Sequence, residues 1–592
     1  MASAVKQLEK VLLDEISLEA PEAILERFRH LIRESGSEDE RIASQFLVSL
    51  LEKWGVPYRV HHPQLYLSIP KKARIKLIEP HLKEFVAKTP SFSVSTEDSW
   101  GSGELVYIPA GDDEIGLEDW FDAEMYRRLN NLEGKVVITE GYAMPGKVAA
   151  FNDKGVAAAI FINPGQNIHD GICTSIWGAP DLDNMNNEPQ IPVLAVNKYD
   201  GEELKKLSQT GKVVLEFQTQ LEKGWFPCPL IDILIKGTEE PEKYVLLHGH
   251  LDSWHVGIGD NATGDAALIE MARIFHKHQD KLKRSLRIAI WPGHSTGRYA
   301  GSTWFADQFG LDLEENCIAQ VNCDSPGCRW ATSYEYMDWM SEVDEFCQEA
   351  IKDAVGQASK GNRPVRAGDY SFNNIGITSF FMLSSSIPEE ILKEKGYYPV
   401  GGCGANIEWH THEDLMHVVD YDVLVKDLQV YITSVIRVLQ APIHPFFFTK
   451  TVDDIKQTIQ AYQVRIGEHF SFDQAVAEAD NLLHALAAFY QRLEKLSDRE
   501  ISDPQVQLAN KQLLQLARIL VPINYTRQGK FRHDPALDVP PLPDLAPACE
   551  LGNTAVGSHV YNVVQTHLTR GQNRVAWALK QATSIVREEQ SR

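Results

Sequence analysis

The sequence predicts an α/β protein with a mixed, mostly parallel sheet, helices on both faces, a strand-rich insert and a C-terminal helical domain. Three apolar runs, YVLLHGH, LRIAIWPGH and IAQVNCD, lie between helical segments, as parallel strands buried on both faces do. Short apolar runs between Gly, Asn and Pro clusters fill residues 96–222, and helical periodicity returns after residue 446.

These changes in sequence pattern mark the expected domain boundaries. We expect a core in two parts, 1–95 and 223–445, with the insert at 96–222 and the helical domain at 446–592. A chain of 592 residues normally forms several domains. The apolar faces of the last segment require a partner, either the main body or a second copy of the chain.

One helix of the first part has clear ends in the sequence. Ser37 with Glu40 three residues later is a capping-box pattern, and the apolar residues that follow repeat at helical spacing. The pattern stops near Gly55, before the strand-like YRVHH. We therefore expect a helix between Ser37 and Gly55.

Composition excludes several classes of partner. The balance of 58 Lys+Arg against 82 Asp+Glu gives a net charge of −24, which argues against nucleic acid and anionic lipid. No apolar run approaches the roughly 18 residues of a membrane span, and the N-terminal segment alternates charges, so we expect a cytoplasmic protein. Its 8 Cys include no CxxC pair, which argues against a disulfide framework or a thiolate zinc site.

The segment HGHLDSWHVGIGDNATG carries the clearest chemical signal. His250 and Asp252 follow a strand, and Asp260 precedes a helix start. An imidazole and a carboxylate that converge, with a second carboxylate to orient the imidazole, form a zinc-type site. Further strand ends add Asp324 in VNCDSPG and His410 in EWHTHED.

In this order, the motifs resemble the zinc aminopeptidase and glutamate carboxypeptidase family, which also contains the transferrin receptors. GKVVITEG and KVAAFNDKGVAAAIFINPG are similar to its protease-associated insert, and GDYSFNNIGITS to its loop before the last metal ligand. The resemblance implies an aminopeptidase-like core, a helical dimerisation domain and zinc bound by His250, Asp260, Asp324 and His410. Asp260 would bridge two ions.

The sequence departs from the family at one loop. The family pattern resembles W-x-x-E-E-x-G-x-x-G-S, in which the first Glu is the general base and the second a ligand, but this chain has WPGHSTGRYAGS. Ser295 is a poor ligand, so we expect one tightly bound ion and an uncertain second one. His294 is either the proton-transfer residue or a ligand.

Three functions follow as hypotheses. The first is hydrolysis of a peptide-like or other amide bond, with His294 and Asp252 as catalytic residues and with Arg298 and Tyr299 binding a substrate carboxylate. The second is a metal-dependent lyase or cyclase acting on a small amino-acid-like substrate, which the lost glutamate permits. The third is a non-catalytic receptor-like or scaffold protein. A homodimer is expected from the resemblance.

Overall fold

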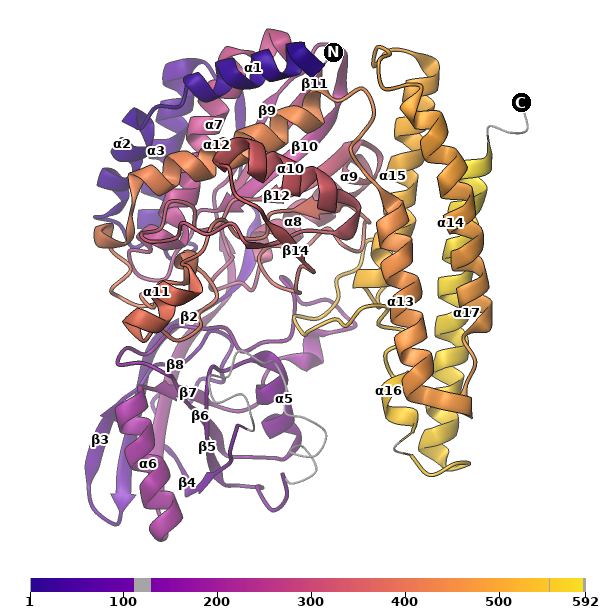
Figure 1. The fold of residues 1–592 in the computed structure, drawn as a ribbon. Helices are drawn as coiled ribbons and strands as arrows, with labels where there is room; N and C mark the ends of the chain where they lie inside the picture. Colours follow the sequence, from indigo (N-terminus) through magenta and orange to yellow (C-terminus); the bar gives the residue numbers. More distant parts are fainter. Residues whose placement is uncertain (1, 111–128, 553, 589–592) are drawn as a thin grey trace.

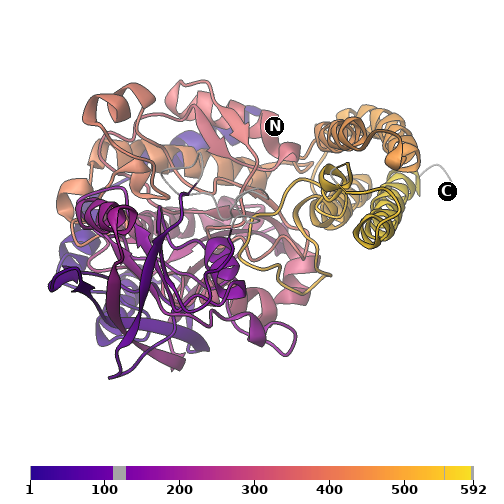
Figure 2. The same cartoon turned by 90° about the horizontal axis from the view of Figure 1, so that it is seen from below.

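The protein has three parts in the computed structural model, which describes residues 2–110, 129–552 and 554–588 (Figure 1). An α/β core occupies the upper left of that view, a sheet-rich unit lies below it, and long helices stand at the right. Seen from below, the long helices form a block beside the other two parts (Figure 2). No described helix is long and apolar enough to cross a membrane.

The core sheet is mixed and mostly parallel, as predicted. Its order is β1-β9-β11-β10-β12-β15, in which β10 pairs in parallel with both β11 and β12. β12 and β15 are also parallel, whereas β9 is antiparallel to its two neighbours. The strands are β1 (Tyr58–His61), β9 (Leu230–Ile235), β10 (Glu240–His250), β11 (Arg284–Trp291), β12 (Cys317–Asn322) and β15 (Thr378–Phe380).

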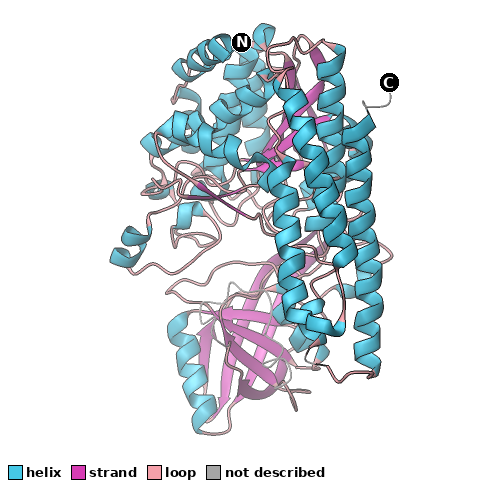
Figure 3. Cartoon of the chain, turned by 45° about the vertical axis from the view of Figure 1, so that its right-hand side comes forward, coloured by secondary structure: helices cyan, strands magenta, loops and turns pink. Residues whose placement is uncertain are grey.

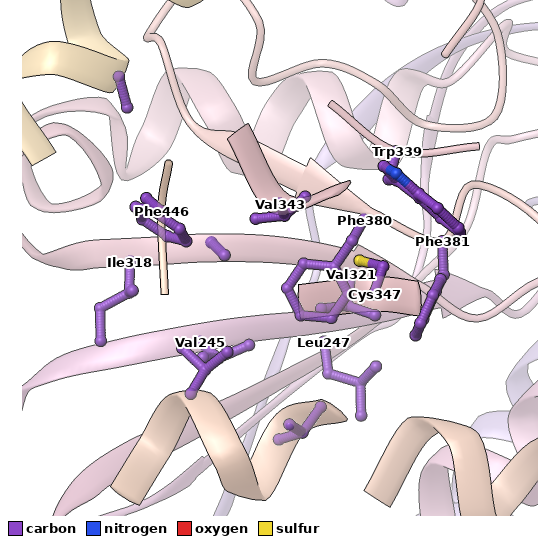
Figure 4. Close-up of a cluster of buried hydrophobic side chains, with 14 of the residues drawn as sticks. Val245, Leu247, Ile318, Val321, Trp339, Val343, Cys347, Phe380, Phe381 and Phe446 are labelled. Carbon is purple, nitrogen blue, oxygen red and sulfur yellow. The ribbon is translucent and has the colours of Figure 1, made fainter. Parts of the chain in front are cut away.

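Helices cover both faces of this sheet because its central strands are apolar on both sides. Val245 and Leu247 of β10 pack into one core cluster, part of which is shown in Figure 4. Tyr244 and Leu246, pointing the other way, join a second cluster. The core helices are α1 (Ala2–Asp14), α2 (Glu19–Phe28), α3 (Glu38–Trp54), α7 (Thr263–Lys277), α8 (Ala300–Gln308), α9 (Gly310–Asn316), α10 (Asp344–Val355), α11 (Glu389–Lys395) and α12 (Tyr421–Gln440).

The helix predicted between Ser37 and Gly55 is confirmed as α3. The Ser37 hydroxyl accepts a hydrogen bond from the Glu40 backbone N–H at 3.1 Å. Gly55 ends the helix with φ of 70°, a conformation that glycine adopts without strain.

A second sheet forms the lower unit, which is rich in strands in Figure 3. Its order is β3-β2-β8-β4-β5-β6-β7, and the last four strands are parallel. Because β2 pairs with β8 along most of its length, this sheet also includes residues before 96, the predicted start of the insert. The unit contains β2 (Gln64–Glu79), β3 (Lys83–Val86), β4 (Gly101–Tyr107), β5 (Val136–Glu140), α5 (Pro145–Asp153), β6 (Ala158–Ile162), β7 (Val193–Val196), α6 (Lys198–Thr210) and β8 (Val214–Pro227).

The C-terminal part is helical. Its helices are α13 (Phe448–Ile466), α14 (Asp473–Glu494), α15 (Pro504–Tyr525), α16 (Ala548–Leu551) and α17 (His559–Arg587). Arg518 of α15 ties them to the core by donating to the carbonyls of Gly376 at 2.9 Å and Cys317 at 2.5 Å. Between α15 and α16 an extended connector, rich in proline, returns toward the core.

Candidate active site

The candidate site lies at the carboxyl ends of three adjacent parallel strands. His250 ends β10, His294 follows β11 and Asp324 follows β12. In open α/β sheets, ligands bind at this edge. The structure therefore brings together residues that are 74 positions apart in the chain.

Asp260 lies between two of the predicted metal ligands. Its Oδ1 is 2.9 Å from His250 Nε2, and its Oδ2 is 3.1 Å from His410 Nε2. Asp324 Oδ2 is 3.7 Å from His250 Nε2. The four predicted ligands thus converge, in an arrangement suited to a carboxylate that bridges two positions.

Both imidazoles have their second nitrogen fixed by a backbone carbonyl. His250 Nδ1 donates to the Asp252 carbonyl at 2.8 Å, and His410 Nδ1 donates to the Asp170 carbonyl at 2.9 Å. A neutral imidazole held in this way has its lone pair on Nε2, the atom that faces Asp260.

The donor atoms fit a divalent cation. His250 Nε2 and Asp260 Oδ1 are buried and, among the described residues, neither has a hydrogen-bond partner, although they are only 2.9 Å apart. Two acceptor atoms that do not share a hydrogen bond repel each other at this distance. A cation bound between them would satisfy both. Imidazole nitrogen and carboxylate oxygen are the donors that zinc takes in such sites.

Asp252 contributes to the site through a different contact from the one predicted. Its backbone carbonyl, rather than its carboxylate, orients the His250 ring. The carboxylate is fully buried and accepts the backbone N–H groups of His294 at 3.1 Å and Ser295 at 2.9 Å. Asp252 therefore fixes the loop that carries His294.

His294 lies against the predicted metal ligands. Its ring stacks on that of His250, with centroids 3.8 Å apart and an interplanar angle of 13°. His250, His294 and Asp324 each offer a ligand atom within 4.8 Å of the others, and the three form the one such group found among the described residues. Since His294 Nδ1 bonds elsewhere, its Nε2 is the atom available for a metal or a proton.

Asp369 is a candidate site residue that the sequence analysis did not single out. Its Oδ2 is 2.7 Å from His294 Nδ1, and its Oδ1 accepts from the Ser302 hydroxyl at 2.7 Å. Burial raises the pKa of Asp369, but the charge and hydrogen bond of His294 outweigh this and lower it to about 2. Asp369 lies in GDYSFNNIGITS, so the motif could have pointed to it.

A hydrogen-bond chain continues from Asp369 to the insert. Ser302 Oγ is 2.8 Å from Ser371 Oγ, which accepts from Trp177 Nε1 at 2.8 Å. The Trp177 ring also contacts that of Tyr299 at a tilt of 35°, with centroids 4.3 Å apart, and Tyr299 meets His294 edge-on at 4.9 Å. The insert is therefore connected to His294 by two routes.

The site opens into a cavity of ≈ 580 Å³. The predicted substrate-binding residues Arg298 and Tyr299 line it together with His294 and the metal-ligand candidates other than His250. The insert contributes its wall near Tyr142, and the connector before α16 contributes Leu537. Pockets of this size suit small-molecule ligands.

The insert also holds the His410 side of the site. Besides accepting from the His410 ring, Asp170 donates its backbone N–H to the His410 carbonyl at 2.9 Å. The Asp170 carboxylate binds Lys88 at 2.6 Å and His255 at 2.8 Å. The contacts of Asp170 with His410 and His255 join the insert to two loops of the core beside the cavity.

Comparison with known proteins agrees with this geometry. Residues 232–433 match the model of peptidase family M28. Carboxypeptidase Q of Xenopus laevis is 24% identical over 288 residues, which are 46% of this chain and 58% of that protein. A probable glutamate carboxypeptidase, VP8 of Zea mays, is 32% identical over 117 residues, which are 19% of this chain and 16% of that protein.

Two solved structures share the fold. The aminopeptidase from Aneurinibacillus sp. strain AM-1 superposes with a TM-score of 0.53 and 17% identity, covering 72% of this chain and 95% of that one. A peptidase M28 precursor from Shewanella amazonensis SB2B gives a TM-score of 0.55 and 17% identity, covering 74% and 96%. Residues 232–433 thus resemble peptidase family M28, and the chain shares the fold of these aminopeptidase and peptidase structures.

Proposed function

We propose that the protein is a metal-dependent hydrolase of peptide-like amide bonds in which His294 transfers the proton. The observation that supports this most directly is the His294–Asp369 pair beside the ligand cluster, with His294 facing the cavity. A buried carboxylate on Nδ1 holds the imidazole in the tautomer that leaves Nε2 as a base.

We propose His250, Asp260 and Asp324 as the ligands of one tightly bound ion, with His410 on the other side of Asp260. A bound zinc-type ion would polarise the scissile carbonyl and lower the pKa of a water molecule. The alternative role of His294 as a ligand remains compatible with its distance from His250 and Asp324.

The residues of the chain account for the proton balance of hydrolysis. His294 Nε2 removes a proton from the attacking water as its oxygen bonds to the carbonyl carbon. As the C–N bond breaks, the same nitrogen returns that proton to the leaving amine. Asp369 stabilises the imidazolium between the two steps, and Asp252 keeps the loop in place.

Hydrolysis can be distinguished from the other reactions by isotope labelling. We would incubate metal-loaded protein with dipeptides and N-acyl amino acids in H₂¹⁸O and analyse the products by mass spectrometry. Hydrolysis predicts one ¹⁸O in the acid product and no reaction with His294→Ala. A product without label would favour the lyase or cyclase hypothesis, and a stoichiometric metal without turnover would favour a binding protein.

A further inference from the structure

Arg366 is a buried cation that makes no direct contact with a carboxylate among the described residues. Its side chain lines the cavity, and the residue is 7% exposed. Both terminal nitrogens donate to backbone carbonyls, that of Tyr370 at 2.6 Å and that of Asp534 at 2.7 Å. Its Nε has no hydrogen-bond partner, and within the described part of the chain Arg366 forms no ion pair.

Burial lowers the pKa of Arg366 whereas the charge of the Asp534 carboxylate raises it, but this carboxylate is hydrogen-bonded to other groups. It accepts from the Arg527 backbone N–H at 2.8 Å and from Asn374 Nδ2 at 2.9 Å. It therefore holds the connector rather than the Arg366 guanidinium.

Arg298 adds a second cation to the same wall. Its Nε is also buried without a partner, and no ion pair involves it in the described ranges. Burial lowers the pKa of Arg366 to about 10, and the nearby charge of Arg298 acts in the same direction. Two cations without ion-pair partners repel each other and lose hydration on burial, and a bound anion would offset both costs.

Trp177 lies behind Arg366, outside the cavity lining. The Arg366 guanidinium carbon is 3.5 Å from the centroid of the Trp177 ring, which contacts the Tyr299 ring at a tilt of 35°, with centroids 4.3 Å apart. The aromatic surface excludes water from the guanidinium, which strengthens its attraction for an anion. Tyr299 in turn meets His294 at 4.9 Å, so two aromatic rings connect Arg366 to His294, and both arginines line the same cavity as His294.

We infer that Arg298 and Arg366, the latter backed by Trp177, form a pocket for an anionic group, a carboxylate or a phosphate, carried by the substrate in the cavity that His294 also lines. That the anion belongs to a substrate rests on the proposed function. The anion-binding pocket itself is inferred from the two arginines without ion-pair partners. It adds Arg366 and Trp177, which come from a core loop and the insert, to the predicted contact of Arg298.

Anion binding is testable without turnover. We would titrate metal-loaded protein with sodium glutarate and with inorganic phosphate in a calorimeter, using sodium chloride to match ionic strength. Saturable binding of either anion is expected, at least 10-fold weaker in Arg298→Met and in Arg366→Met. Arg570→Met, which removes an exposed arginine of α17, should bind as the unaltered protein does. The anion that binds more tightly shows whether the pocket prefers a carboxylate or a phosphate.

Equal binding by Arg298→Met and the unaltered protein would overturn the inference, as would no saturable binding. Arg298→Met keeps the test valid if the buried Arg366→Met fails to fold. A second readout is the hydrolysis of two amides that differ only in a carboxylate. The amide with the carboxylate should be preferred by at least 10-fold in kcat/KM. Arg298→Met should lose this preference with its metal content unchanged. Turnover without that preference would refute the pocket alone, whereas anion binding without turnover would refute the hydrolase alone.

Discussion

His294 Nδ1 lies 2.7 Å from Oδ2 of Asp369, a carboxylate with no exposed surface. The two residues come from different loops at the same edge of the core sheet. The contact determines which nitrogen of His294 faces the cavity and allows a positive charge on its ring. This pair supports the proposal that His294 transfers the proton where the family resemblance implies a glutamate.

Replacing Asp369 with Asn should lower kcat by about 10²-fold or more, because the amide does not stabilise the imidazolium and does not enforce the tautomer. KM and metal content should stay near their original values, as measured by steady-state kinetics and elemental analysis. Asp427→Asn is the matched control, since Asp427 is also buried but bonds to Gly327, Tyr334 and Ser385 rather than to His294. Unchanged kcat in Asp369→Asn would exclude the pair from the mechanism.

The two roles of His294 predict different results for His294→Ala. If His294 transfers the proton, turnover should fall by about 10²-fold or more with the metal retained. If it is a ligand, the metal should be lost or weakened, and added zinc should restore activity. The double change His294→Glu and Ser295→Glu should preserve hydrolysis in a peptidase but abolish a lyase or cyclase reaction.

One tightly bound divalent ion per chain is expected, since His250, Asp260 and Asp324 converge whereas Ser295 has replaced a carboxylate ligand. Asp260→Ala should remove this ion, because the Asp260 carboxylate lies between both imidazoles. Elemental analysis after dialysis measures the occupancy. Two ions at full occupancy would show that another residue, His294 being the best placed, completes the second position.

Three of the four metal-ligand candidates could be predicted because each follows an apolar run or opens a helix, and the ends of parallel strands meet at one edge. The strand end predicted before His410 is wrong, since His410 lies in a turn, and its prediction rested on the family resemblance. Asp369 gave no such signal, since it lies in a loop with a positive φ of 60° and no periodic pattern. Trp177 depends on how the insert docks on the core, which is a matter of long-range packing. For the same reason, the pairing of β2 with β8 could not be inferred from local patterns.

Buried Asp265 should make the metal-free protein less stable as pH rises. Burial raises its pKa to about 8, and neither carboxylate oxygen has a hydrogen-bond partner among the described residues. The folded state therefore keeps a proton that the unfolded chain loses near pH 4, so stability falls between about pH 4 and pH 8, by at most about 1.4 kcal/mol per pH unit.

Asp265→Asn should flatten this slope in calorimetric unfolding from pH 5 to pH 8 after chelation. Asp280→Asn, an exposed change just beyond α7, provides the control and should leave the slope as it is. The same slope in Asp265→Asn and the original protein would assign the effect to other groups.

A homodimer formed through the helical domain is expected. α17 exposes Val560, Val563 and Trp577, which fall on one face of the helix, and Trp577 is 61% exposed. Light scattering at micromolar concentration should give twice the chain mass of 66.6 kDa. Trp577→Glu should shift the mass toward that of one chain, whereas a single-chain mass for the original protein would contradict the expectation.

The reciprocal bonds between Asp170 and His410 have a thermodynamic consequence. A residue of the insert sets the orientation of a metal-ligand candidate in the core, so the affinity for metal and the docking of the insert are coupled. Coupling free energies act equally in both directions. If docking of the insert makes metal binding more favourable, metal binding makes docking more favourable by the same free energy. Chelation of the metal should therefore make the insert easier to cleave from the core by a protease.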